Sequence, residues 1–202
     1  MHLAELSTAQ LLALGRISDC PCGKQHETQL KYLELGAGVL AKLPEMLQQA
    51  GYRRPFAICD PNTYAAAGQR ALALLDAAGI SYRYLQLRER KPEPDEAALG
   101  QLCMQFDASC DCILAIGGGV INDLGKMLAA ATGKRSIMVA AAPSMDGFAS
   151  GSGSMVVGGV KVSLSCPCPI GVIADTEIMA AAPMRMLQAG LGDALAKYIS
   201  IC

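Results

Sequence analysis

Short apolar runs alternate with longer segments of helical periodicity along most of the chain. The apolar runs predict strands at residues 31–35, 55–60, 81–87, 111–116, 136–141 and 171–174. Apolar residues three and four positions apart predict helices at residues 39–50, 63–78, 95–106 and 121–132, after an N-terminal helix at about 4–14. Such alternation predicts an α/β fold, with a mostly parallel sheet covered by helices on both faces.

Two segments interrupt this alternation. MVVGGVKVS, residues 155–163, carries Gly158 and Gly159 between two β-branched runs, which predicts a hairpin with a two-residue turn. Beyond residue 175 the pattern is purely helical, and Pro183 opens a new helix at residues 184–189. We therefore expect an α/β domain over residues 1–176 and the beginning of a helical second domain over residues 177–202.

Composition and charge exclude several classes of partner. The 202 residues include 17 basic and 18 acidic ones without a long block of either sign, which argues against nucleic-acid and anionic-membrane binding. No apolar stretch reaches the roughly 20 residues that span a bilayer, and the start has no basic secretory region. Nine cysteines, an odd number, indicate reduced thiols. The expected location is the cytoplasm, with small molecules or other protein chains as partners.

Two glycine-rich turns compete as a phosphate-binding site. In LGAGVLA, Gly36, Gly38 and Ala41 match the dinucleotide-binding pattern G-x-G-x-x-G/A, and Asp60 follows at the end of the next strand. In ILAIGGGVIND, three glycines at 117–119 lie between a strand and a helix, where backbone amides and the helix N-terminus attract an anion. Each turn would suit a Rossmann-like domain, and each could equally be a plain connection.

The segment AAAPSMDGFASGSGS, residues 140–154, favours the second turn. It follows a predicted strand and places small and hydroxyl residues around a single carboxylate, Asp146. A connection of this composition at the carboxyl end of a strand is where functional residues concentrate.

Three motifs then resemble one family. GGGVIND (117–123), APSMDGFAS (142–150) and AGLGDALAKY (189–198) are similar, in order and spacing, to the sn-glycerol-1-phosphate dehydrogenases. These belong to a superfamily with glycerol dehydrogenases, iron-containing alcohol dehydrogenases and dehydroquinate synthases. CPCGKQH, from Cys20 to His26, resembles the Cys-rich turn that opens many bacterial members.

The resemblance implies a two-domain oxidoreductase. Its α/β domain would bind NAD or NADP, and its helical domain would bind a divalent metal such as zinc, nickel or iron. Substrate would lie between the domains, and hydride transfer would interconvert dihydroxyacetone phosphate and sn-glycerol 1-phosphate. Asp60 would bind the adenosine ribose, which leans toward NAD because a carboxylate repels a 2′-phosphate.

The resemblance also implies roles for the residues of the motifs. The pyrophosphate would be held by Gly118, Gly119, Val120, Ile121, Asn122 and Asp123. The nicotinamide side would be lined by Ala141, Ala142, Pro143 and Ser144, with Ser150 contacting the cofactor. Asp146 would contact the substrate, and Asp193 would be a metal ligand that also faces the substrate.

Three of the charged residues in these motifs also have simpler structural interpretations. Asp146 before Gly147 suits a turn, and Asp123 suits a first-turn acid paired with Lys126. Lys197 lies one helical turn after Asp193 and would pair with it.

The cysteines also allow both a functional and a structural interpretation. Cys20 and Cys22 with His26 could bind zinc, although C-x-C spacing favours a polar turn. A nucleophilic thiol is the weaker interpretation, because hydride transfer needs no covalent intermediate. Burial is expected for Cys59, Cys103, Cys110 and Cys112.

Histidine is where this sequence departs from the family. The family completes its metal site with two histidines from the helical domain, whereas this chain has only His2 and His26. The chain is therefore expected to bind dinucleotide but to hold metal weakly and turn over poorly. A glycerol dehydrogenase, a dehydroquinate synthase-like lyase and a stand-alone dinucleotide-binding module remain alternatives. Self-association through residues 184–201, as in a homo-oligomer, is also expected.

Overall fold

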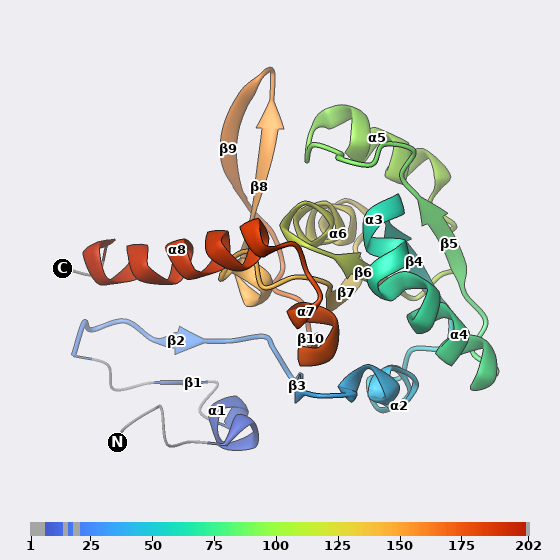
Figure 1. Ribbon diagram of the computed structural model, residues 1–202, viewed down its shortest axis with the longest axis horizontal. Helices are drawn as coiled ribbons and strands as arrows, with labels where there is room; N and C mark the ends of the chain where they lie inside the picture. Colours follow the sequence, from blue (N-terminus) through green and yellow to red (C-terminus); the bar gives the residue numbers. More distant parts are fainter. Residues whose placement is uncertain (1–6, 14–15, 18–20, 201–202) are drawn as a thin grey trace.

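The computed structural model describes residues 7–13, 16–17 and 21–200. Its centre is a six-stranded sheet in the order β3-β10-β7-β6-β4-β5, and all neighbouring pairs are parallel (Figure 1). The strands are β3 (Tyr32–Gly36), β4 (Pro55–Cys59), β5 (Arg83–Gln86), β6 (Cys112–Gly117), β7 (Arg135–Ala140) and β10 (Gly171–Asp175). The predicted parallel α/β sheet is confirmed.

Helices cover both faces of this sheet. The main ones are α2 (Leu43–Gln49), α4 (Gln69–Ala77), α5 (Glu96–Gln105) and α6 (Gly119–Thr132). Two predicted helices begin with tighter or wider turns: η2 (Val39–Lys42) precedes α2, and α3 (Pro61–Thr63) with η3 (Tyr64–Gly68) precedes α4. Three helices end at glycines with positive φ, namely Gly51 (80°), Gly79 (66°) and Gly133 (67°).

Alternating strand residues build two separate cores. In β4, Phe56 and Ile58 belong to the core that includes residues of α5 and α6, whereas Ala57 and Cys59 belong to the one that includes residues of α2 and α4. This doubly covered sheet explains why the strands read as continuous apolar runs rather than as alternating ones.

The strand order changes direction between β4 and β6. The chain continues from β4 outward to β5, then returns to β6 and proceeds through β7 and β10 in the opposite direction. α4 and α6 follow these neighbouring strands on opposite faces, as the two cores show. Doubly wound sheets bind ligands at the carboxyl ends of the strands at this switch point.

A hairpin and a small ribbon lie outside the sheet. β8 (Ser152–Val157) and β9 (Val160–Ser165) form the predicted hairpin, in which Gly158 and Gly159 take φ values of 57° and 79°. Near the N-terminus, α1 (Thr8–Ala13) confirms part of the expected helix, whose remaining residues lie outside those described. After it, β1 (Arg16–Ile17) and β2 (His26–Glu27) pair as an antiparallel two-stranded ribbon, and residues 21–25 of the expected polar turn precede β2.

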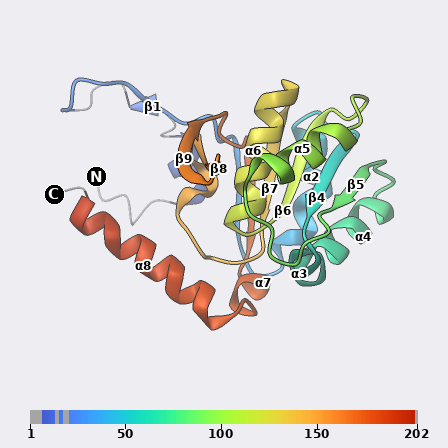
Figure 2. The same cartoon turned by 90° about the horizontal axis from the view of Figure 1, so that it is seen from above.

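The last helix differs most from expectation. After α7 (Thr176–Ala180), α8 (Met184–Ser200) joins the predicted helix at residues 184–189 and the helical turn expected from Asp193 to Lys197 into one helix, which runs away from the sheet (Figures 1 and 2). None of its side chains is buried, and its exposed large apolar residues are Met184, Leu191, Leu195, Tyr198 and Ile199. With about 3.6 residues per turn, these five lie on one side of the helix. No helix among the described residues is long and apolar enough to cross a bilayer.

Candidate functional site

The first glycine turn is occupied by a carboxylate of the chain itself. Asp175, at the end of β10, is fully buried and accepts hydrogen bonds from the backbone N–H groups of Gly38, Leu40 and Glu177, each at 3.1 Å. The amides that a dinucleotide phosphate would need are therefore already engaged. The turn at Gly36 and Gly38 is a structural connection, although its sequence matches the dinucleotide pattern.

Asp175→Asn is expected to lower the free energy of unfolding by about 2 kcal/mol at pH 7, because charge-assisted bonds to buried N–H groups are lost. Burial disfavours the charged carboxylate, but the three backbone donors outweigh it and hold the pKa of Asp175 below its ordinary value. The stabilisation is therefore complete above the ordinary pKa of about 3.9 and is lost as the pH falls through the folded-state pKa. Urea denaturation from pH 7 to pH 3 measures this loss.

The exposed Asp76→Asn in α4 is the matched control and should change little. An Asp175→Asn variant as stable as the wild type at pH 7 would contradict this description of the first turn.

The second glycine turn, residues 117–119, leaves its amides open. Gly118 is the N-cap of α6 and provides no side-chain cap for the helix. A Cβ added at Gly117 would lie 2.6 Å from Cβ of Ile121, so this glycine permits a close approach of β6 and α6. The first amides of a 14-residue helix are thus unpaired by any side chain and carry the positive end of its dipole.

Two cavities adjoin this turn at the switch point. The first has a volume of about 500 Å³ and includes Gly118, Ala141 and Ala142 in its wall, together with the residues that follow β4 and β10. The second has a volume of about 830 Å³ and includes Gly119, Val120, Asp123, Asp146, Ser150 and Asp193. The structure therefore brings most of the predicted site residues to one region, on either side of the glycine pair.

Five predicted residues do not line either cavity. They are Asp60, Ile121, Asn122, Pro143 and Ser144. The side chains of Ile121 and Asn122 are buried, and the backbone N–H of Asn122 donates to the carbonyl of Gly118 at 3.0 Å, so of these two residues only Ile121 offers an amide to a ligand at the helix start. Oδ1 of Asn122 is a buried acceptor without a partner among the described residues.

Asp60 lies at the end of β4, but its carboxylate is turned into the chain. Oδ1 accepts from the backbone N–H groups of Asn62 (2.8 Å) and Thr63 (2.9 Å), which caps α3, and the residue is 6% exposed. The neighbouring 500 Å³ cavity is instead bordered by the guanidinium-bearing residues Arg90 and Arg185. Asp60 itself is not in the cavity wall, so its contact with the adenosine ribose and the repulsion of a 2′-phosphate stay predictions.

Lys126 is a buried cation beneath the second cavity. The residue is 1% exposed, and its Nζ lies 3.1 Å from Oδ1 of Asp123 and 3.1 Å from Oγ of Ser150. Its Nζ also donates to the carbonyl oxygens of Gly147 and Ser152. Lys126 thus ties helix α6 to residues 147–152, and the expected pairing with Asp123 is confirmed.

Asp146, Asp193 and Lys197 meet at the rim of the same cavity. Nζ of Lys197 lies 2.8 Å from Oδ2 of Asp146, and the backbone N–H of Asp146 donates to Oδ2 of Asp193 at 2.9 Å. Within the described residues Lys197 pairs with Asp146 rather than with Asp193, so the prediction of a pair within the helix is wrong. The reason is that the loop brings Asp146 against α8, and a short contact across elements replaces the one along the helix.

Lys197→Gln is expected to raise the pKa of Asp146 toward its ordinary value. Lys197 donates a hydrogen bond to the Asp146 carboxylate and adds positive charge, which together outweigh partial burial and hold that pKa low. An NMR titration of the Asp146 carboxyl carbon measures the change, with Lys134→Gln at the far end of α6 as the control. Superimposable Asp146 titrations in the wild type and Lys197→Gln would contradict the pairing.

Gly190 fixes how α8 meets this loop. A Cβ added at Gly190 would lie 1.8 Å from the carbonyl oxygen of Pro143, which no rotamer change can relieve because the obstacle is backbone. Glycine at this position therefore allows α8 to lie directly on the loop that presents Asp146.

Of the seven cysteines that the structure describes, five are buried. Cys59, Cys110 and Cys112 are buried as predicted, and burial raises the pKa of Cys59 to about 11. Cys103 is exposed on the outer face of α5, so its predicted burial is wrong: Leu102 takes the inward position. Cys22 is exposed and Cys20 lies outside the described residues, which leaves the zinc alternative a hypothesis.

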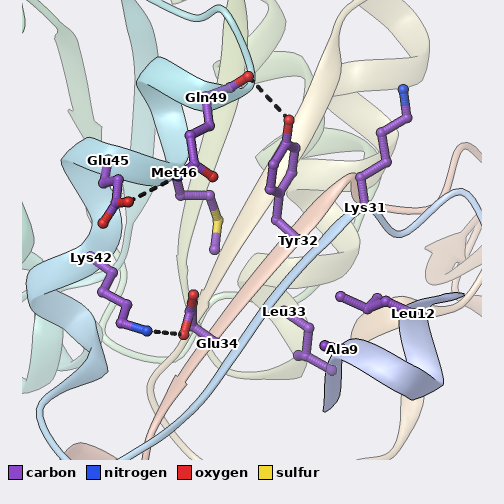
Figure 3. Close-up of a pocket in the computed structure, with 10 residues that line it drawn as sticks. All are labelled: Ala9, Leu12, Lys31, Tyr32, Leu33, Glu34, Lys42, Glu45, Met46 and Gln49. Atoms are coloured by element: carbon purple, nitrogen blue, oxygen red, sulfur yellow. Dashed lines mark hydrogen bonds and ion pairs between the residues drawn. The ribbon is translucent and has the colours of Figure 1, made fainter. Parts of the chain in front are cut away.

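A third cavity, of about 380 Å³, lies beside the edge strand β3, between α1 and α2 and away from the two cavities at the switch point (Figure 3). Most of its polar groups are paired: Lys42 pairs with Glu34 at 2.7 Å, Gln49 donates to Glu45, and Tyr32 donates to the carbonyl of Gln49. None of the predicted site residues lines it. It is a poor candidate for the functional site.

A metal site needs three or four protein ligands close together. Among residues 7–13, 16–17 and 21–200, no three His, Cys, Asp or Glu side chains are grouped to hold a metal ion. Asp193 and Asp146 are neighbours, but Asp146 is engaged by Lys197. The described residues therefore do not complete a metal site.

Fold and site together define a doubly wound α/β domain with a ligand site at its switch point. The sequence profile of the iron-containing alcohol dehydrogenase family matches residues 34–183. The chain belongs to that family.

Similar proteins agree with this assignment. Over 188 residues the chain is 36% identical to a glycerol-1-phosphate dehydrogenase (NAD(P)+) from Halalkalibacterium halodurans, covering 91% of this chain and 47% of that protein. A probable glycerol dehydrogenase from Sinorhizobium meliloti 1021 matches in structure with a TM-score of 0.72 and 25% identity, over 84% of this chain and 46% of that one. An alcohol dehydrogenase from Oenococcus oeni has a TM-score of 0.75 at 18% identity, over 84% and 51%, which shows the fold alone. The chain spans about half the length of the curated relatives it matches.

Proposed function

We propose that this chain is the NAD(P)-binding part of an oxidoreductase that interconverts dihydroxyacetone phosphate and sn-glycerol 1-phosphate. The observation that carries the proposal is the open N-terminus of α6, where Gly118 and Gly119 separate the two cavities at the switch point. It is supported by the similarity to a relative named glycerol-1-phosphate dehydrogenase (NAD(P)+).

The residues around the turn suit a dinucleotide. Amides at the start of α6 would bind the pyrophosphate, and the small side chains of Ala141 and Ala142 leave room beside them. When bound, the nicotinamide supplies or accepts the hydride. Ser150, held by Lys126, would orient that ring, and Asp146 with Lys197 would face the substrate in the same cavity.

Two further assignments belong to the proposal. Asp193 is the first ligand of a divalent metal, and Asp60 contacts the adenosine ribose through Oδ2, the oxygen that α3 does not use. Because the described residues do not complete a metal site, no reaction step is ascribed to a metal here. The division at residues 176 and 177 and a cytoplasmic location also stay predictions.

Calorimetric titration of the chain with NADH and with NADPH tests the binding function. A Kd between about 1 µM and 1 mM is expected for at least one of them, in the range usual for enzyme ligands. No heat of binding with either coenzyme at several millimolar would refute the proposal.

The isolated chain is proposed to turn over poorly, because its described residues do not complete a metal site. Incubating it with dihydroxyacetone phosphate, NADH and zinc, nickel or iron salts tests this point. Rapid NADH oxidation would contradict the proposed inactivity while leaving the binding function intact.

A glycerol dehydrogenase is the second candidate, favoured by the solved structure of that name at 25% identity. It predicts that unphosphorylated triols and ketones bind as well as phosphorylated ones. The same titrations with dihydroxyacetone and with its phosphate separate the two functions.

Association of α8 with another copy of the chain is a further proposal, based on its five exposed apolar residues. Light scattering at high protein concentration should show species larger than a monomer, and a clean monomer would count against it.

A further inference from the structure

The hairpin β8–β9 has two chemically different faces. Met155, Val162 and Leu164 pack against the core that α5 and α6 form. The opposite face carries serines and one lysine, because successive side chains of a strand alternate. The pairing places Ser154 opposite Ser163 and Val156 opposite Lys161.

The polar face of the hairpin is one wall of the 830 Å³ cavity. Ser152, Ser154, Val156 and Lys161 line it from the hairpin, and Asp193 and Lys197 line it from α8. A strand that only covered the core would not need hydroxyl groups and an ammonium group facing a cavity of this size.

Lys161 differs in its pairing from Lys197 in the same cavity and from the buried Lys126 beneath it. Lys126 is bound to Asp123, and Lys197 is bound to Asp146. For Lys161, the described part of the chain offers no ion pair or hydrogen bond. An ammonium group that lines a ligand cavity without a counter-ion is available to bind an anion of the ligand.

One carboxylate in the cavity could compete. Glu93 lines the same space, on a segment that runs beside the hairpin because the N–H of Val156 donates to the carbonyl of Pro94 at 2.8 Å. Glu93 forms no ion pair within 4.0 Å in the described structure, so it does not pair with Lys161. Its negative charge weakens the attraction of the cavity for an anion.

We infer that Lys161, with the hydroxyl groups of Ser152 and Ser154, forms a subsite for the phosphate group of a small phosphorylated polyol or ketone. This inference rests on the proposed function for the identity of the ligand, and it makes Lys161 the residue that distinguishes phosphorylated from unphosphorylated substrates. An ammonium group with neighbouring hydroxyl donors commonly binds phosphate. Lysine acts there as a point charge, without the bidentate geometry that arginine provides.

The test compares dihydroxyacetone phosphate with dihydroxyacetone, titrated into 15N-labelled chain saturated with NADH. In the wild type the phosphate should bind more tightly and perturb the amides of residues 152–163. Lys161→Gln should weaken phosphate binding about tenfold, as loss of one charged hydrogen bond does, and leave dihydroxyacetone unaffected. Glu93→Gln should strengthen phosphate binding, and Lys31→Gln, in the cavity beyond β3, should change nothing.

Inorganic phosphate in the same experiment separates this inference from the proposed function. If the chain binds NADH but Lys161→Gln retains the full preference for the phosphorylated ligand, the subsite is refuted and the proposed function stands. If neither coenzyme binds, while inorganic phosphate perturbs residues 152–163 in the wild type and not in Lys161→Gln, the proposed function fails and the subsite stands.

Discussion

Replacing Lys126 with methionine is expected to lower the free energy of unfolding by about 3–5 kcal/mol, the usual cost of removing one partner from a buried ion pair. Methionine keeps the volume of the stem but leaves Asp123 without its cation at 3.1 Å. It also leaves the carbonyl groups of Gly147 and Ser152 without the donor that holds them to α6. Chemical denaturation at neutral pH measures the loss.

Two further variants decide whether the effect comes from this pair. Asp123→Asn in the Lys126→Met background should recover part of the loss, since the unpaired charge disappears. Lys134→Met, beyond the end of the same helix, should cost little. A Lys126→Met chain within 1 kcal/mol of the wild type would rule out the role assigned to this cation.

Gly118→Val is expected to weaken NADH binding by about a hundredfold or more while the chain remains folded. A Cβ at Gly118 has no atom nearer than Oγ of Ser144 at 3.7 Å, so the fold accepts a side chain there. The added methyl groups enter the 500 Å³ cavity at the start of α6, where the pyrophosphate would contact the amides.

Gly100→Val in α5 is the matched control, because a Cβ there also meets open space but lies away from both cavities. Thermal unfolding checks that both variants fold, and calorimetry gives the two affinities. Wild-type affinity in folded Gly118→Val would exclude the second glycine turn as the dinucleotide site.

The sheet could be predicted from sequence because its signal is local. Each strand is an apolar run bounded by turn residues, and all six predicted strands are present within one or two residues. Helix was expected on both sides of Gly190, but its continuity through Gly190 and Gly192 could not be predicted this way, since no side chain of α8 is buried in this chain.

The site was only partly accessible to sequence reasoning. Motif order placed Gly118, Asp146 and Asp193 correctly in one region, because the carboxyl ends of parallel strands share an edge of the sheet. The neighbouring segment at residues 140–154 already favoured the second glycine turn, but the reason why the first is closed needed the structure. Asp175 lies more than 130 positions after Gly38, and no local pattern indicates that its carboxylate fills the first turn.

The roles of three residues could be recognised only from the fold. Gly190 permits contact between α8 and Pro143, Lys126 supports the loop at 147–152, and Lys161 faces the larger cavity. The strand alternation of MVVGGVKVS could have indicated that Lys161 lies on the polar face of its hairpin. The cavity on that face depends on α8, however, and a local pattern does not contain it.

The most direct measurement for the central claim is an NMR titration of the 15N-labelled chain with NADH. The account predicts that the amides of residues 118–121 shift most, with those of residues 141–150 following, while residues 36–40 stay unchanged because Asp175 occupies them. The largest shifts at residues 36–40, with residues 118–121 unmoved, would contradict it.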